Sequence, residues 1–331
     1  MPPPDRPRAS RRRFSSTLPA LPLLGAAPSL RAQTWPSRPI RIMCPSAAGG
    51  LLDQIGRLIA DRLGRDLKTP VVVENRPGGT GSVALDAIAK APADGYTIGI
   101  GFSGGNIIYP LLNPKLPFDA RRDFSMLGMI GIVSNLLVVQ PDLPPTDLAS
   151  FITWVKAQPT PPPYASWGNG SGGHLAGEYL KMLTGIDMYH VPYRSMTALA
   201  TDLLGGHMKI AFADASSLPL VLSGKLRAIA QVGPRGSPLL PQVRTMKEQG
   251  VAFDTGSWIA LIGPAGMPAP IAGQLNAELN KILQDPALNE RWISILGTTP
   301  MPSTPAAMEQ TLKTDWDVWK SVIDKAHIVL E

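Results

Sequence analysis

Residues 39–53, which read PIRIMCPSAAGGLLD, contain the pattern that decides the fold. The first six residues favour a β-strand, Pro45 ends it, and two glycines follow. Beyond the glycines, apolar residues recur at helical spacing: Leu51, Leu52, Ile55, Leu58, Ile59 and Leu63. A strand, a short loop and a helix N-terminus in this order direct backbone N–H groups and the positive end of the helix dipole at one point. The stretch therefore predicts an anion-binding site.

A second stretch, residues 164–175 with the sequence YASWGNGSGGHL, repeats this pattern of strand, amide-rich turn and helix N-terminus. Ser166, Asn169 and Ser171 add short polar side chains to it. Neither residues 45–53 nor residues 166–174 contain Lys or Arg. A phosphate usually requires a cation or a metal, whereas amides and hydroxyls can hold a carboxylate. The two loops together predict a shared carboxylate cleft, and the alternative is two ordinary turns before serine-capped helices.

Strand and helix patterns alternate along the chain in two series. The first series has predicted strands at residues 39–44, 70–75 and 96–101, and the second has them at 136–140, 164–166, 188–191, 208–212 and 226–230. A strand at 256–262 returns to the first series, and the chain is helical from Pro268 onward. We therefore predict an α/β fold of two lobes, each a mostly parallel sheet flanked by helices, joined by two crossing hinge strands. The predicted division is 33–136 plus 257–331 for lobe 1 and 137–256 for lobe 2.

Most of the net charge of +6, namely +5, comes from the N-terminal segment. Residues 1–32 hold six arginines and one aspartate, so the other 299 residues carry 25 basic and 24 acidic side chains, which gives no support to nucleic-acid binding. Within this segment, SRRRF is followed by a short apolar stretch at residues 18–27. This resembles a twin-arginine export signal cleaved near Ala32, and the alternative is a disordered basic tail. We therefore expect an exported, soluble, periplasmic protein.

Several classes of enzyme are disfavoured by the sequence. Ser171 and His174 lie close together, but a nucleophile elbow requires Gly where position 169 is Asn. Gly99, Gly101 and Gly104 fit a dinucleotide fingerprint, yet they follow the third strand instead of opening the fold. The four histidines lack metal-ligand spacing, and the single cysteine, Cys44, excludes an intramolecular disulfide. We predict neither catalysis nor a cofactor nor a metal.

An ordered series of motifs resembles the periplasmic substrate-binding proteins of tripartite tricarboxylate transporters, the Bug-type receptors. The motifs are WPSRPIRI at 35–42, VVENRPG at 72–78, DGYT at 94–97, YAS at 164–166, GNGS at 168–171, HLAGE at 174–178, HVPYR at 190–194, DLLGG at 202–206, GKLRA at 224–228 and SW at 257–258. The resemblance implies a two-lobed flytrap that captures a small organic carboxylate between its lobes. It also implies delivery to a membrane permease of the tripartite tricarboxylate type by a monomeric receptor. The alternatives are an orphan sensor acting on a signalling kinase and a dinucleotide-dependent enzyme.

The same resemblance implies that the two glycine-rich loops grip the ligand, largely through backbone groups and ordered water. The predicted ligand-binding residues are Ser46, Ala48, Gly49, Gly50, Asp53, Ser103, Ser166, Asn169, Gly170, Ser171, His174, Asp214 and Trp258.

The chain departs from the family pattern at positions that bear on the ligand. Ser46 replaces a phenylalanine, Ala48 replaces a proline, and Leu51-Leu52 replaces a polar pair. Trp167 stands where a small residue is common, and Asp214 comes one place later than the family's aspartate. We expect a more apolar cleft, which favours an aromatic or longer aliphatic carboxylate over aspartate or citrate.

Overall fold

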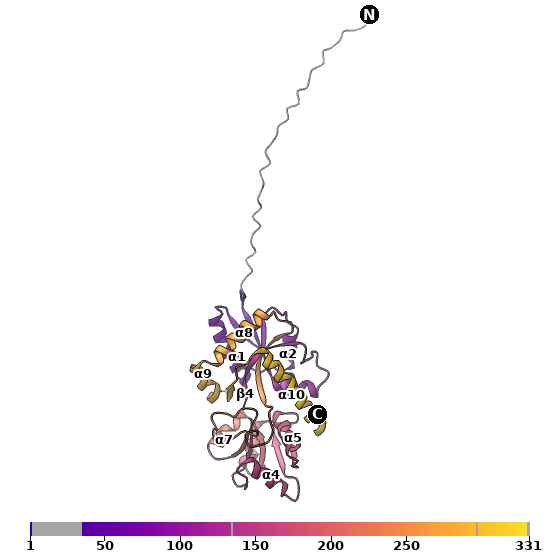
Figure 1. Ribbon diagram of the computed structural model, residues 1–331, viewed down its shortest axis with the longest axis vertical. Coiled ribbons are helices and arrows are strands. Elements are labelled where there is room, and N and C mark those ends of the chain that lie inside the picture. Colours follow the sequence, from indigo (N-terminus) through magenta and orange to yellow (C-terminus); the bar gives the residue numbers. More distant parts are fainter. Residues whose placement is uncertain (2–34, 134, 296, 330–331) are drawn as a thin grey trace. The chain divides into compact units, whose positions relative to one another are not determined.

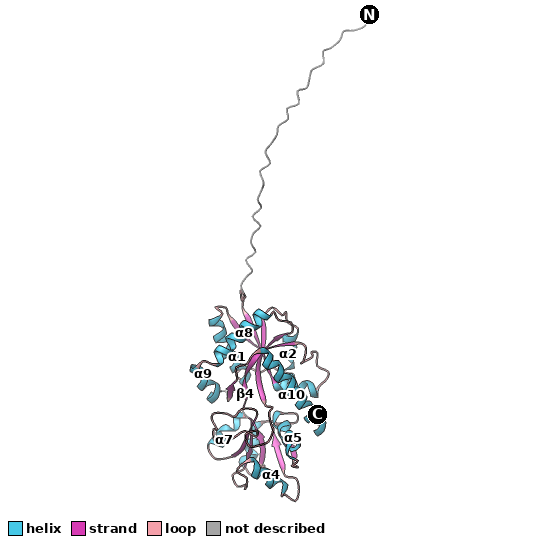
Figure 2. Ribbon diagram, viewed as in Figure 1, coloured by secondary structure: helices cyan, strands magenta, loops and turns pink. Residues whose placement is uncertain are grey.

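A computed structural model describes Met1 and residues 35–133, 135–295 and 297–329. The predicted export signal, apart from Met1, lies outside the described residues. Residues 35–329 contain two β-sheets with helices packed on them, which Figure 1 shows along the chain and Figure 2 by element type. None of the helices in the described part of the chain has the length and apolar character needed to span a bilayer.

The first sheet has six strands in the order β11-β4-β10-β3-β1-β2. They are β1 (Ile40–Cys44), β2 (Val71–Asn75), β3 (Thr97–Phe102), β4 (Phe124–Val133), β10 (Ser257–Pro264) and β11 (Thr298–Pro300). The strands β2, β1 and β3 run parallel, whereas β10 runs antiparallel to both β3 and β4, and β11 is antiparallel to β4.

The second sheet has five strands in the order β7-β6-β8-β5-β9. They are β5 (Asn135–Val139), β6 (Pro163–Ser166), β7 (Tyr189–Pro192), β8 (Ile210–Ala213) and β9 (Arg227–Val232). The pairs β6–β7 and β6–β8 are parallel, and β5 is antiparallel to β8 and β9. The chain passes between the sheets twice, from β4 to β5 and from β9 to β10.

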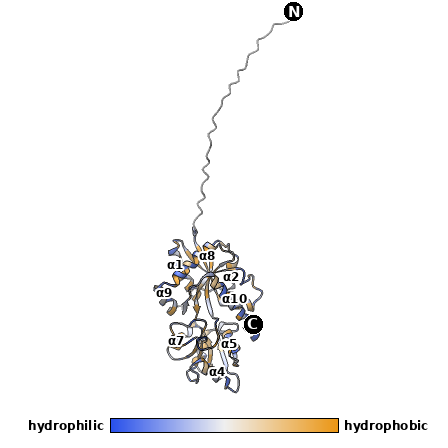
Figure 3. Ribbon diagram, viewed as in Figure 1, coloured by the Kyte–Doolittle hydropathy of each residue, from blue (hydrophilic) through white to orange (hydrophobic). Residues whose placement is uncertain are grey.

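Helices cover both faces of the first sheet. Alternate strand residues pack against α1 (Leu51–Asp66) and α8 (Ala269–Leu283) on one face of the sheet, and against α2 (Ser82–Ala89) and α10 (Pro305–Ala326) on the other. The spacing of Ile55, Ile59 and Leu63 gives α1 one apolar stripe, which is fully buried, while its other side is polar (Figure 3).

The second sheet is covered in the same way. Its helices are α4 (Leu148–Lys156) and α5 (Gly172–Thr184) on one face, and α6 (Met196–Leu204) and α7 (Leu218–Leu222) on the other. Three of these helices begin at polar caps, because Asp147, Ser171 and Ser195 each accept a hydrogen bond from a first-turn N–H. The shorter helical turns are η1 (Gly79–Gly81), η2 (Gly104–Ile108), α3 (Tyr109–Leu112), η3 (Ala215–Ser217), α9 (Pro286–Glu290) and η4 (Arg291–Ile295).

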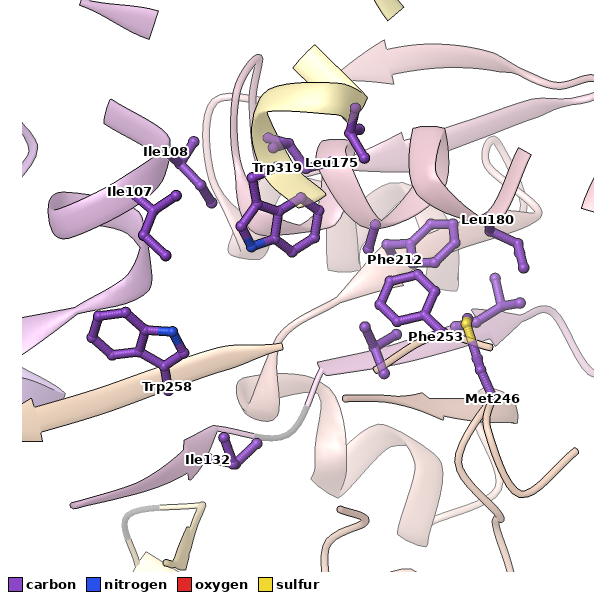
Figure 4. Packing of buried hydrophobic residues seen from close by; sticks show 14 of the residues in the cluster. Ile107, Ile108, Ile132, Leu175, Leu180, Phe212, Met246, Phe253, Trp258 and Trp319 are labelled. Carbon is purple, nitrogen blue, oxygen red and sulfur yellow. The ribbon is translucent and has the colours of Figure 1, made fainter. Parts of the chain in front are cut away.

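One buried cluster runs through both lobes by way of α10. Figure 4 shows members from the first lobe, Trp258 and Ile132, and from the second, Phe212 and Leu175, with Trp319 of α10. The ring of Trp319 lies 6.0 Å from that of Tyr179 on α5. The two sheets therefore share apolar packing along α10, in addition to the two chain crossings.

The two-lobed α/β fold is confirmed, but both sheets are mixed instead of mostly parallel. The crossing strands cause the difference, because each enters its sheet antiparallel to a neighbour. The sequence prediction also missed β4 and β11. Glycines interrupt the β-pattern of β4, and Gly131 is required by packing, since a Cβ there would lie 2.5 Å from the carbonyl oxygen of Thr299 in β11.

Candidate ligand-binding site

A cavity of about 550 Å³ lies between residues of the two lobes. Its walls contain the start of three helical segments: Leu51 and Leu52 of α1, Ser103 and Gly104 at the start of η2, and residues 170–172 at α5. First-turn N–H groups have no acceptor inside their own helix, and the dipole places partial positive charge there. Three helix starts thus contribute to the cavity wall, and at α1 the carboxylate of Asp53 in the first turn already offsets part of the positive charge.

The loop before α5 is held by a network of short side chains. Ser171 caps the helix by accepting a hydrogen bond from the His174 N–H, at 3.2 Å. The Ser166 hydroxyl lies 3.0 Å from the Ser171 hydroxyl and 2.7 Å from Nε2 of His190. With the third amide of the helix satisfied in this way, the amide of Gly172, which lines the cavity, remains for an anion.

His174 and His190 form a stacked pair behind this loop, with ring centroids 3.7 Å apart and planes 9° from parallel. Nδ1 of His174 accepts a hydrogen bond of 3.1 Å from the N–H of Gly170. Burial lowers the pKa of His174 to about 4, and burial together with the neighbouring His174 lowers the pKa of His190 to about 3. Both rings are neutral at neutral pH and support the loop, and neither lines the cavity.

The loop before α1 is closed on itself by hydrogen bonds. Asp53 is 2% exposed and accepts hydrogen bonds from Gly49 N–H (2.8 Å), Asn75 Nδ2 (2.8 Å) and Arg57 Nε (2.9 Å). Burial raises its pKa, but these three donors outweigh burial and lower the pKa to about 2. The Ser46 hydroxyl in turn accepts from the Asp53 N–H at 3.1 Å. The polar groups of this loop therefore bind one another.

The structure divides the thirteen residues predicted to bind ligand into two groups. Six line the cavity: Ser103, Asn169, Gly170, Ser171, Asp214 and Trp258. The other seven lie in the two loops or in the strand and helices that flank them, without lining the cavity: Ser46, Ala48, Gly49, Gly50, Asp53, Ser166 and His174.

Two of the lining residues, Asp214 and Trp258, are held in place by hydrogen bonds to residues outside the cavity wall. Asp214 caps η3 by accepting a hydrogen bond of 2.9 Å from Ser216 N–H, and it is the only charged side chain among the described residues of the wall. Trp258 is 1% exposed and its indole Nε1 donates a hydrogen bond of 2.9 Å to Asp315 of α10. Burial raises the pKa of Asp315 to about 6.

Most of the remaining wall is apolar; Leu51, Leu52 and Trp167 were expected from the sequence to make the cleft apolar, and the other members were not predicted. It comprises Leu51, Leu52, Phe102, Ile108, Tyr109, Leu112, Val133, Trp167 and Ile259, with the smaller or polar Thr80, Gly104, Asn135, Gly172 and Ser257. A signal for part of this set exists in the sequence, because FSGGN at 102–106 is a third strand-to-helix junction with two glycines. Asn135 and Ser257 lie at the chain crossings and are joined by a hydrogen bond of 2.8 Å.

Among the described residues, neither Lys nor Arg lines the cavity, and no group of three or more His, Cys, Asp or Glu side chains could hold a metal. The arrangement can bind a carboxylate through amides and hydroxyls, with its apolar part against aliphatic and aromatic side chains.

Comparisons with known proteins agree with this geometry. A profile of the family described as "Tripartite tricarboxylate transporter family receptor" matches residues 55–328. Protein BugT of Bordetella pertussis is 34% identical over 305 residues, covering 90% of this chain and 92% of that protein. The structure of Rpa4515 from R. palustris with adipate is 31% identical with a TM-score of 0.71, over 89% of this chain and 99% of that one. MatC from Rhodopseudomonas palustris with bound malate is 28% identical with a TM-score of 0.66, over 87% and 100%.

Proposed function

This chain belongs to the tripartite tricarboxylate transporter receptor family, and from that premise we propose that it captures a small organic carboxylate in the cavity between its lobes. Like these relatives, it is a solute-binding receptor and not an enzyme. Its proposed location is the periplasm, and its proposed partner is a membrane permease of the tripartite tricarboxylate type, which it serves as a monomer.

The observation that carries the proposal is the convergence of three helix N-termini on one cavity whose described wall contains neither Lys nor Arg. A carboxylate gains charge-assisted hydrogen bonds from such amides without a cation. Relatives with bound adipate and malate support this ligand class. Leu51, Leu52 and Trp167 in the wall support the expectation of an aromatic or longer aliphatic acid.

In this proposal the predicted site residues act in two ways. The cavity-lining group contacts the ligand, and Ser46, Ala48, Gly49, Gly50, Asp53, Ser166 and His174 shape the loops. The lobes are proposed as 33–136 plus 257–331 and 137–256. The pairing of β5, from Asn135, within the second sheet supports a boundary at this crossing.

A charge introduced at the α5 N-terminus tests the binding site. Gly172 is the first residue of α5, and a Cβ there makes only ordinary contacts, the nearest at 3.4 Å. In Gly172→Asp the new carboxylate should favour the helix dipole, so stability is retained, while it repels a bound carboxylate. We expect a thermal-shift panel of carboxylates to show stabilisation of the wild type and none of Gly172→Asp.

Gly172→Ala is the matched control, since it adds the Cβ without the charge. Retention of carboxylate binding by Gly172→Asp would contradict the proposed site. Native mass spectrometry of the purified wild type, which reports a retained acid by its mass, identifies the ligand class independently.

A further inference from the structure

A second cavity, of about 480 Å³, adjoins the ligand-binding cavity. The two share Leu51, Val133 and Asp214 in their walls. Because three residues from different segments line both, the two cavities are neighbours, and Leu51, Val133 and Asp214 lie between them. We call the new one the second chamber.

The wall of the second chamber is mainly apolar. Besides the shared residues, its larger apolar members are Leu218, Pro219 and Leu222 of α7 together with Leu239. Leu222 is 59% exposed, which leaves much of an aliphatic side chain in contact with water. A ligand segment that covered these side chains would gain hydrophobic stabilisation in proportion to the area it buries.

The charge of Asp214, which lines both cavities, limits which ligands can extend from one cavity into the other. Asp214 is the only charged side chain among the described residues of either wall. A ligand with a second carboxylate at its far end would meet this negative charge and find no cation in the described walls to compensate it. An uncharged methylene chain has no such conflict.

We propose that the receptor binds a monocarboxylate with an extended aliphatic tail, which has a charge at one end only. Its carboxylate binds at the N-terminus of α5, and its tail passes Asp214 into the second chamber against Leu218 and Leu222. This inference rests on the proposed carboxylate-binding function and specifies the ligand class for the same site. It makes Asp214 and Leu222 determinants of specificity.

Isothermal titration of the purified chain with hexanoate, octanoate and decanoate, and with the equal-length diacids adipate, suberate and sebacate, tests the proposal. Each methylene that enters the second chamber should lower the Kd of the monoacids about fourfold, equivalent to about 0.8 kcal/mol. Octanoate should bind at least tenfold more tightly than suberate. In Leu222→Glu the ratio of the hexanoate Kd to the decanoate Kd should fall toward one.

Leu204→Glu is the matched control, because Leu204 is also an exposed helical leucine (48%) but lines neither chamber. It should retain the wild-type ratio, and Asp214→Asn should narrow the gap between octanoate and suberate. Equal affinity for hexanoate and decanoate, or tighter binding of suberate than octanoate, would overturn the proposal while leaving carboxylate binding intact. Failure of all these acids and of the whole thermal-shift panel of carboxylates to bind would overturn the proposed function itself.

Discussion

Replacing Asp315 by Asn should raise the free energy of unfolding relative to that of the wild type, and this gain should be larger at neutral pH than at acid pH. Asp315 is 6% exposed on α10, and the structure gives it a hydrogen bond from Trp258 but no ion pair with a described residue. Burial raises its pKa from 3.8 to about 6. The difference of about two units corresponds to ~3 kcal/mol between the neutral and charged forms.

The sign follows from which form the fold favours. A raised pKa means that the folded protein prefers the neutral acid, so this stabilisation is complete below pH 3.8 and is lost as the pH rises through about 6. Asn keeps an acceptor for the indole and cannot ionise. The free energy of unfolding of Asp315→Asn minus that of the wild type should therefore increase by ~3 kcal/mol between pH 3.5 and pH 7.

Urea unfolding at a series of pH values measures this difference directly, since the other titrating groups cancel between the two proteins. Asp254→Asn is the control, because Asp254 is an exposed carboxylate paired with Lys247, and its removal should change stability by less than about 1 kcal/mol. A difference between Asp315→Asn and wild type that stays constant with pH would refute the argument from burial.

Two further predictions concern the first lobe. Asp53→Asn should destabilise the protein by ~2 kcal/mol at pH 7, because the lowered pKa of Asp53 gives stability that is present above pH 3.8 and is lost as the pH falls through about 2. Urea unfolding at pH 7 measures this loss, and an unchanged free energy of unfolding would contradict the role of the three donors. Gly131→Ala should lower the melting temperature because its Cβ would lie 2.5 Å from the Thr299 oxygen, whereas Gly273→Ala, in open space on α8, should stabilise the protein by about 0.5–1 kcal/mol. Changes in melting temperature of the same sign for the two variants in calorimetry would contradict the packing argument.

The strand-to-helix junctions were predictable from sequence because each is a local pattern. A β-rich run, glycines and apolar residues at helical spacing all lie between Pro39 and Leu63, and the structure has β1 and α1 there. The twofold alternation of such units indicated two α/β lobes for the same reason. Periodicity is set by backbone geometry and needs no partner from elsewhere in the chain.

The direction of each strand and the composition of the cavity wall were decided by tertiary structure. The antiparallel entry of β10 between β3 and β4 depends on pairing across more than a hundred residues, which no local pattern encodes. In the loop before α1, the Asp53 carboxylate accepts a hydrogen bond from Gly49 N–H, and the Ser46 hydroxyl accepts one from Asp53 N–H. These polar side chains are used within the loop, and Leu51 and Leu52 line the cavity. Sequence alone therefore located the amide-rich junctions, whereas long-range packing determined which side chains from them line the cavity.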